Sequence, residues 1–170
     1  MRLVIDRTWD DKPAGAEVVV QLTRTNESLA IEVDAPFHDD PPPMGPPGST
    51  PRLWDHEVVE VFFLGDDERY LEVELSPHGH HLVLELHGVR QVVREALPLD
   101  YEAEVQGTRW RGLARLPIGL LPCGWSHVNA FAVSGTGDSR RHLAWRPAGG
   151  PSPDFHRLDA FDPVFPHEEE

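Results

Sequence analysis

The stretch RLWDHEVVEVFF, at residues 52–63, combines an aromatic ring and carboxylates with the most apolar run of the chain. Glu60 lies inside that run, where an ionised carboxylate is costly unless it is paired or hydrogen bonded. An ion pair with Arg69, Arg90 or Arg94 would satisfy it structurally. Alternatively, Glu60 contacts ligand hydroxyls or a metal ion, or it is a neutral acid that donates a proton. Glu60 is therefore the first candidate for a functional side chain.

Trp54 precedes the same run and is expected at the end of a strand. There it is either a plug at the edge of the core or a platform on which a ligand stacks. An indole ring can pack on the apolar face of a sugar while nearby carboxylates, here Glu57 and Glu60, accept hydroxyl hydrogen bonds. A fully extended chain separates Trp54 from Glu60 by about 20 Å at ~3.3 Å per residue. A shared site therefore requires a bend at residues 54–57.

Three histidines, His78, His80 and His81, cluster in the segment SPHGHHL. Imidazoles can ligate zinc or a similar metal, and the carboxylates of Glu72 and Glu74 could approach them. However, an extended chain points His80 and His81 to opposite faces, and cysteine ligands are absent. We therefore interpret the segment as a solvated turn whose histidines tune a polar site.

Carboxylates form three further groups. Glu72, Glu74 and Glu85 share one face of neighbouring strands by parity, as a hydrolase with paired carboxylates would need, although solvated sheet faces share this pattern. Acidic loops at 38–40 and 65–68 could bind calcium, but neither has the ligand spacing of an EF-hand. We expect a solvated surface in each case, and no cofactor, with calcium and zinc as the metals to consider.

Alternating apolar and polar residues predict the strands that must position these groups. In the segment at 70–76, for example, Leu71 and Val73 point inward while Tyr70, Glu72 and Glu74 point outward. No window has sustained helical periodicity, apart from a short helical turn near 118–121. The fold class predicted is an all-β, antiparallel, jelly-roll-like sandwich of the carbohydrate-binding-module type. The predicted strands are 16–23, 28–35, 58–64, 70–76, 81–87, 101–106, 109–116, 127–134 and 142–146.

The chain length of 170 residues is that expected of a single domain spanning residues 1–170. Residues 36–52 contain seven prolines, so they form a loop, either a spacer or part of a site. The acidic end, 166–170, is expected to be frayed.

Charge and composition exclude several functions. The net charge of −14 disfavours binding to nucleic acid. No apolar run approaches the ~20 residues that span a bilayer, so no membrane partner is expected. The single cysteine, Cys123, fits a reducing compartment, and we predict a cytoplasmic protein. The sequence leaves the oligomeric state open.

Five segments resemble motifs of an uncharacterised protein family. They are TWD at 8–10, APFHDDPP at 35–42, LWDHEVVEVFFL at 53–64, YLEVELSPHGHHLVL at 70–84 and PDFH at 153–156. The resemblance runs through most of the chain and implies no established activity.

More distantly, the pattern resembles the family 9 carbohydrate-binding modules, which are β-sandwiches that hold a sugar between two tryptophans. By motif position, Trp54 matches the first stacking tryptophan and Glu60 an acidic residue that contacts sugar. Trp145 lies in the region of the second tryptophan, and Phe155 is the alternative. This resemblance implies a sandwich fold and a carbohydrate ligand.

The leading hypothesis is non-catalytic binding of a small polar ligand, most plausibly a carbohydrate, at a sheet end near Trp54. One alternative is a hydrolase acting on glycosides, using Glu60 with a carboxylate or histidine partner. Another is a protein-interaction domain that uses the proline-rich loop. The predicted ligand-binding residues are Trp54, Glu57, Glu60, Arg69, His78, His81, Trp145 and Phe155.

Overall fold

A computed structural model describes residues 1–164, which form a twelve-stranded antiparallel sheet. The strand order is β7-β6-β5-β4-β10-β11-β1-β2-β3-β9-β8, and β12 pairs with β10. This confirms the predicted all-β, antiparallel fold. The strands are β1 (Arg2–Thr8), β2 (Pro13–Arg24), β3 (Ser28–Pro36), β4 (Val58–Leu64), β5 (Arg69–Leu75), β6 (His81–His87), β7 (Val92–Arg94), β8 (Asp100–Gln106), β9 (Arg109–Pro117), β10 (His127–Ser134), β11 (Arg141–Ala144) and β12 (Asp162–Pro163).

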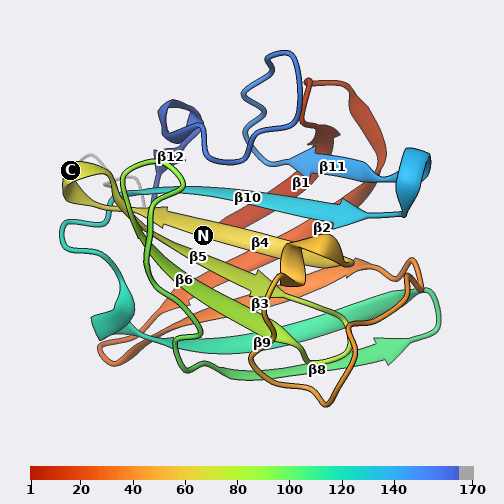
Figure 1. Cartoon of the computed structure of the whole chain (residues 1–170), viewed down its shortest axis with the longest axis horizontal. Helices are drawn as coiled ribbons and strands as arrows, with labels where there is room; N and C mark the ends of the chain where they lie inside the picture. The colour runs from red at the N-terminus through yellow and green to blue at the C-terminus, as the bar shows by residue number, and fades with distance from the viewer. Residues whose placement is uncertain (165–170) are drawn as a thin grey trace.

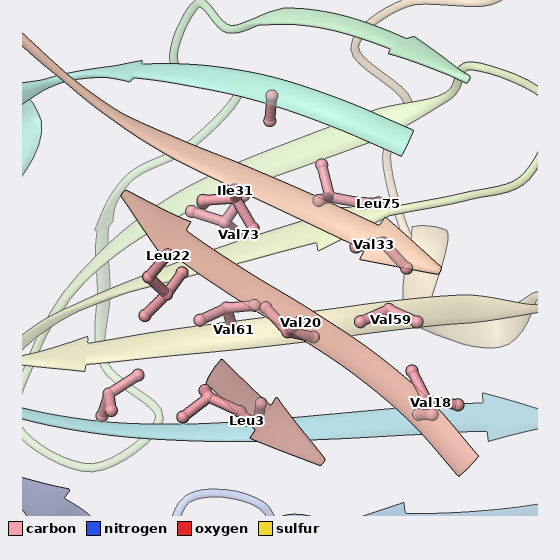
Figure 2. Packing of buried hydrophobic residues seen from close by; sticks show 14 of the residues in the cluster. Leu3, Val18, Val20, Leu22, Ile31, Val33, Val59, Val61, Val73 and Leu75 are labelled. Carbon is pink, nitrogen blue, oxygen red and sulfur yellow. The ribbon is translucent and has the colours of Figure 1, made fainter. Parts of the chain in front are cut away.

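The sheet curls into two layers around the main core (Figure 1). One layer contains β4, β5, β6 and β10, and the other contains β1, β2, β3 and β9. Apolar side chains of β2 and β3 pack against those of β4 and β5 (Figure 2). Val20, Val61 and Val73 have no exposed surface, as expected for alternate residues that face a core. This packing is the sandwich that the alternation predicts.

Most strands were predicted within one or two residues. The sequence analysis missed three of them: β1 at the start of the chain, and the short strands β7 and β12. In β1, Leu3 and Ile5 are fully buried, but two apolar positions give too weak an alternation to stand out. The predicted helical turn is present as the 3-10 turn Ile118–Leu120.

The proline-rich loop contains no strand after Pro36 and is tied to the body of the protein. The backbone N–H of Thr50 donates to the carbonyl of His81 at 2.9 Å. Ser49 forms an isolated bridge with His81. The predicted acidic tail at 166–170 lies outside the described residues. None of the helices in residues 1–164 has the length and apolarity needed to cross a membrane.

The outer face of the β4–β6 layer carries a second apolar cluster, which the C-terminal segment covers. Phe62 of β4 belongs to this cluster, and Phe155 and Phe161 pack onto it from the C-terminal segment. Tyr70, Glu72 and Glu74, which we expected to face solvent, are buried instead, and His156 of that segment contacts Tyr70 and Glu72. Alternation assigns a residue to a face correctly, but it does not reveal that a distant loop covers the face.

The prediction that Glu85 shares a face with Glu72 and Glu74 is wrong. In the β5–β6 register Glu72 is opposite Leu84, whereas Glu85 is opposite Leu71. Directly opposite residues share a face, so Glu85 lies on the other side of the sheet. There it forms an ion pair with Arg94.

Candidate functional site

A pocket of about 440 Å³ opens on the outer face of the β4–β6 layer. The 3-10 turn Leu53–Asp55 contributes to one wall, and the segment 153–156 and the turn at Arg90 contribute to the others. Its volume lies within the range of small-molecule sites. The residues that line it are Trp54, Glu60, Glu72, Leu84, Leu86, Arg90, Val92, Val133, His142, Pro153, Phe155 and His156.

The turn that carries Trp54 supplies the bend that a shared site requires. Arg52 adopts a left-handed backbone conformation immediately before the turn, and Leu53 is fully buried, which anchors it. The guanidinium of Arg140 donates to the backbone carbonyls of Trp54 (2.5 Å) and His56 (3.4 Å). Trp54 itself is 41% exposed, so its ring is available at the mouth of the pocket.

Two buried glutamates, Glu60 and Glu72, line the pocket, and a third, Glu74, lies beside them. Glu60 of β4 is directly opposite Glu74 of β5, and Glu72 is the next residue of β5 on the same face. One carboxylate oxygen of each lies within 4.8 Å of those of the other two. Like charges directly opposite each other destabilise a sheet, and burial increases the cost.

Burial raises the pKa of all three carboxyl groups. The pKa of Glu60 is raised well above its usual value, by burial and then by the charge of Glu72. Burial, followed by the charges of Glu60 and Glu72, has the same effect on the pKa of Glu74. Burial raises the pKa of Glu72 to about 7. Removal from water disfavours the charged form of each acid, and the proximity of the three groups opposes the ionisation of all of them together.

A chain of hydrogen bonds fixes the ring of His156 beside Glu72. The backbone N–H of Arg90 donates to the Tyr70 hydroxyl at 2.9 Å, which leaves that hydroxyl to donate to His156 Nδ1 at 2.7 Å. The proton of the neutral imidazole is then on Nε2, which lies 4.0 Å from Glu72 Oε2. Burial, assisted by Arg90, lowers the pKa of His156 to about 4, so the ring is neutral at pH 7.

The segment 153–156 is fixed by stacking and by charge. The ring of Phe155 stacks on that of Phe131, with centroids 4.0 Å apart and an angle of 11° between the planes. The side chain of Asp154 accepts from Arg90 at 2.8 Å and from the backbone N–H of His156 at 3.0 Å. These contacts hold Phe155 and His156 against the pocket.

Of the eight predicted ligand-binding residues, the structure places Trp54, Glu60 and Phe155 in this pocket. The arginines considered as partners of Glu60 pair elsewhere: Arg90 with Asp154, and Arg94 with Glu85.

Glu57 lies outside the pocket and anchors the proline-rich loop. Its carboxylate accepts from the backbone N–H groups of His38 (3.0 Å) and Asp40 (3.3 Å). Burial raises its pKa despite these bonds. Val58 and Val59, the first two residues of β4, separate Glu57 from Glu60 along the chain. Glu57 is therefore not among the residues that line the pocket with Glu60.

Arg69, His78, His81 and Trp145 also lie outside the pocket. Arg69 is exposed at the start of β5. The rings of His78 and His81 contact those of Phe37 and Tyr101, respectively. Trp145 packs against the main core, because it follows Ala144 of the outer cluster and alternate residues of a strand face opposite ways.

Sequence reasoning missed Arg90, His142 and His156 as residues that line the pocket. His156 belongs to the PDFH motif, so the motif was a signal for it. Glu72 could have been found from the register of β4 and β5 across the turn at 65–68. That register places Glu74 opposite Glu60, and Glu72, two residues away in β5, lies on the same face.

A second hollow, of about 570 Å³, lies on the outer face of the other layer, over β2, β3, β8 and β9. Glu32, Asp34, Glu102, Glu104 and Arg111 contribute charged groups to it. Aromatic rings, which line the first pocket, are absent from its lining within residues 1–164. The second hollow therefore offers charge without a stacking surface.

Solved structures of similar fold define the class of the chain. A "putative carbohydrate-binding protein" from Bacteroides uniformis has a TM-score of 0.75 at 18% identity, over 95% of this chain and 84% of that one. A family 9 carbohydrate-binding module from Caldicellulosiruptor kristjanssonii, in complex with cellotriose, has a TM-score of 0.55 at 11% identity, over 85% and 72%. The chain thus has a fold of the carbohydrate-binding-module type, as the resemblance implied.

The chain belongs to the UPF0462 family. It is 44% identical to the UPF0462 protein C4orf33 homolog of Mus musculus, over 96% of this chain and 90% of that protein. It is 43% identical to UPF0462 protein C4orf33 of Homo sapiens, over 95% and 86%. No family model matches the chain. These relatives confirm the resemblance to an uncharacterised family that the motifs indicated.

Proposed function

We propose that the chain binds a carbohydrate, without catalysis, in the pocket between Trp54 and Phe155. The observation that carries this proposal is that two aromatic side chains and two buried acids, Glu60 and Glu72, line one pocket of about 440 Å³. A sugar presents apolar C–H faces and polar hydroxyls together, and this lining offers a partner for each. The complexes of structurally similar modules with cellotriose and glucose add support.

In the proposed complex, the exposed ring of Trp54 stacks on a sugar ring. Glu60 and Glu72 accept hydrogen bonds from hydroxyls, and Arg90 donates to a ring or hydroxyl oxygen. Charged partners make such bonds stronger than neutral ones. Because the acids are fixed by strands rather than by loops, little of the site has to be ordered when the sugar binds.

A glycan-array screen followed by calorimetry with the tightest-binding glycan tests this proposal. The wild-type chain should give a saturable heat that Trp54→Ala abolishes. The melting temperature of Trp54→Ala should stay nearly unchanged because the side chain is 41% exposed. Unchanged sugar binding by a folded Trp54→Ala variant would rule out this pocket.

The proximity of the acids favours a second candidate, a hydrolase that acts on glycosides. The oxygens of Glu60 and Glu72 lie within 4.8 Å of each other, close to the ~5–5.5 Å between the carboxyl groups of retaining glycosidases. If the chain is such a hydrolase, the wild type should turn over chromogenic glycosides and the Glu60→Gln variant should not. Binding without turnover by the wild-type chain would favour the carbohydrate-binding role.

The role of the proline-rich loop in binding another protein stays a prediction. Shortening residues 36–52 should then remove a co-purifying partner and leave the response to small ligands intact. A cytoplasmic location also stays a prediction, supported by the single cysteine, Cys123.

A further inference from the structure

The cluster of Glu60, Glu72 and Glu74 has a composition that stability alone does not explain. Their exposed fractions are 3%, 4% and 0%, and the three carboxyl groups converge within 4.8 Å. Among residues 1–164, the basic side chain within 4.0 Å of this cluster is His156, beside Glu72, and its ring is neutral at pH 7. Three buried acids that face each other without a lysine or arginine partner repel each other when they ionise, and a bound cation would remove that repulsion.

Glu74 provides an independent observation. Its Oε1 and Oε2 are both buried, and neither accepts a hydrogen bond from a group outside the cluster among the described residues. The side-chain hydrogen bonds of Glu74 are with Glu60 and Glu72. Buried polar groups in folded proteins almost always have a partner. The β4–β5 register places Glu74 opposite Glu60, on the face of the pocket, so the unsatisfied oxygens point into the cluster rather than into the main core.

The ligand atoms available are carboxylate oxygens. The Nε2 atom of His156 carries a proton in the tautomer that Tyr70 fixes, so it is a donor rather than a metal ligand. An oxygen-only set suits hard cations and not zinc or copper. Calcium binds oxygen at about 2.4 Å, so two of its ligands lie up to ~4.8 Å apart, and oxygens within 4.8 Å of one another can share one calcium ion.

We propose that Glu60, Glu72 and Glu74 form a binding site for a divalent cation that prefers oxygen ligands, and that calcium fits within their separations. Glu60 and Glu72 line the pocket, so the cation enters from it and its remaining coordination positions face it. Water or ligand hydroxyls complete the coordination there. This site differs from the acidic loops at 38–40 and 65–68.

The test uses the full chain, stripped with a chelator, and calcium chloride alone as the probe. Calorimetry should show one saturable site in the wild-type chain. Glu74→Gln keeps the shape of the side chain and removes one charged ligand, so its affinity for calcium should fall at least about tenfold. The matched control, Glu85→Gln, changes a glutamate of the neighbouring strand on the opposite face and should bind calcium like the wild type.

A second variant and a second readout guard against misfolding. Glu72→Gln should weaken calcium binding as Glu74→Gln does, and calcium should raise the melting temperature of the wild type more than that of either variant. No saturable heat up to about 10 mM calcium, far above typical sites, would overturn the proposal. Equal calcium affinity in Glu74→Gln and Glu85→Gln would also overturn it.

Cation binding and carbohydrate binding can be tested independently of each other, so one proposal can be wrong while the other is right. Trp54→Ala removes the stacking ring and none of the three carboxylates, so it should lose glycan binding and retain calcium binding. Glu74 does not line the pocket, so a loss of calcium binding in Glu74→Gln reports on the cluster rather than on direct contact with a sugar.

Discussion

The two faces of the layer formed by β4, β5, β6 and β10 differ in what they bury. Toward the other layer, residues such as Val61 and Val73 are fully buried among apolar neighbours. On the outer face, one residue away along the same strands, Glu60, Glu72 and Glu74 are buried almost as completely. The same strands therefore support an ordinary core on one side and a polar, covered site on the other.

This difference separates stability from function in the molecule. Burying apolar surface on the core face stabilises the fold. Burying three carboxyl groups on the outer face costs free energy unless something neutralises them. The three side chains are at most 4% exposed, so water does not offset that cost, and perturbed acids beside a pocket are typical of functional sites.

The largest effect should come from placing a carboxylate on the core face. Val73→Glu buries an acid with no polar neighbour, and we expect a loss of about 5 kcal/mol in the free energy of unfolding, enough to unfold many domains. Urea denaturation measures this loss, with Val73→Leu as the control of similar polarity. If Val73→Glu unfolds at the urea concentration of the wild type, the two faces do not differ as described.

A smaller loss should follow removal of the aromatic centre of the outer cluster. Phe62 contacts the rings of Tyr70, Phe131, His156 and Phe161, so Phe62→Ala should destabilise the chain by about 3 kcal/mol. Thermal and urea denaturation measure the loss. A change below about 1 kcal/mol would show that the outer face contributes little to the fold.

Glu74→Gln should change stability little, in contrast to both substitutions above. The neutral amide has the shape of the acid and removes its repulsion toward Glu60, so without added cation the free energy of unfolding should shift by less than about 1 kcal/mol. The same urea series measures it. A loss above about 2 kcal/mol would mean that Glu74 has an essential structural partner.

The smallest effect on stability should come from replacing either of two exposed arginines, Arg69 or Arg90, with alanine. Arg90 lines the pocket and Arg69 does not. Each Ala variant should stay within about 1 kcal/mol of the wild type, since exposed ion pairs contribute little. Arg90→Ala should weaken glycan binding about tenfold, the size of one hydrogen bond to a charged group. Weaker binding in Arg69→Ala alone would instead support the site predicted from sequence.

Much of the fold could be predicted because each layer buries one face, and alternation records which residues face it. The segment at 70–76 shows both the strength and the limit of this reasoning. Leu71 and Val73 are in the core as predicted, while Glu72 and Glu74 are on the predicted face but covered. The segment 153–156, which lies beside Glu72 on this face, is far away in the sequence.

The candidate site could be predicted only in part for the same reason. The motif resemblance selected Trp54, Glu60 and Phe155, which line one pocket. Glu57, only three residues from Glu60, anchors a loop instead, and Trp145 faces the main core. Side-chain direction at these positions depends on the bend at the turn and on strand register, and spacing in the sequence fixes neither.

A crystal structure of the chain with the glycan that binds most tightly on an array tests the central claim most directly. Our account predicts a sugar ring stacked on Trp54 with a hydroxyl within about 3.2 Å of Glu60 or Glu72. A sugar bound instead in the second hollow, between Glu32 and Glu104, would contradict it.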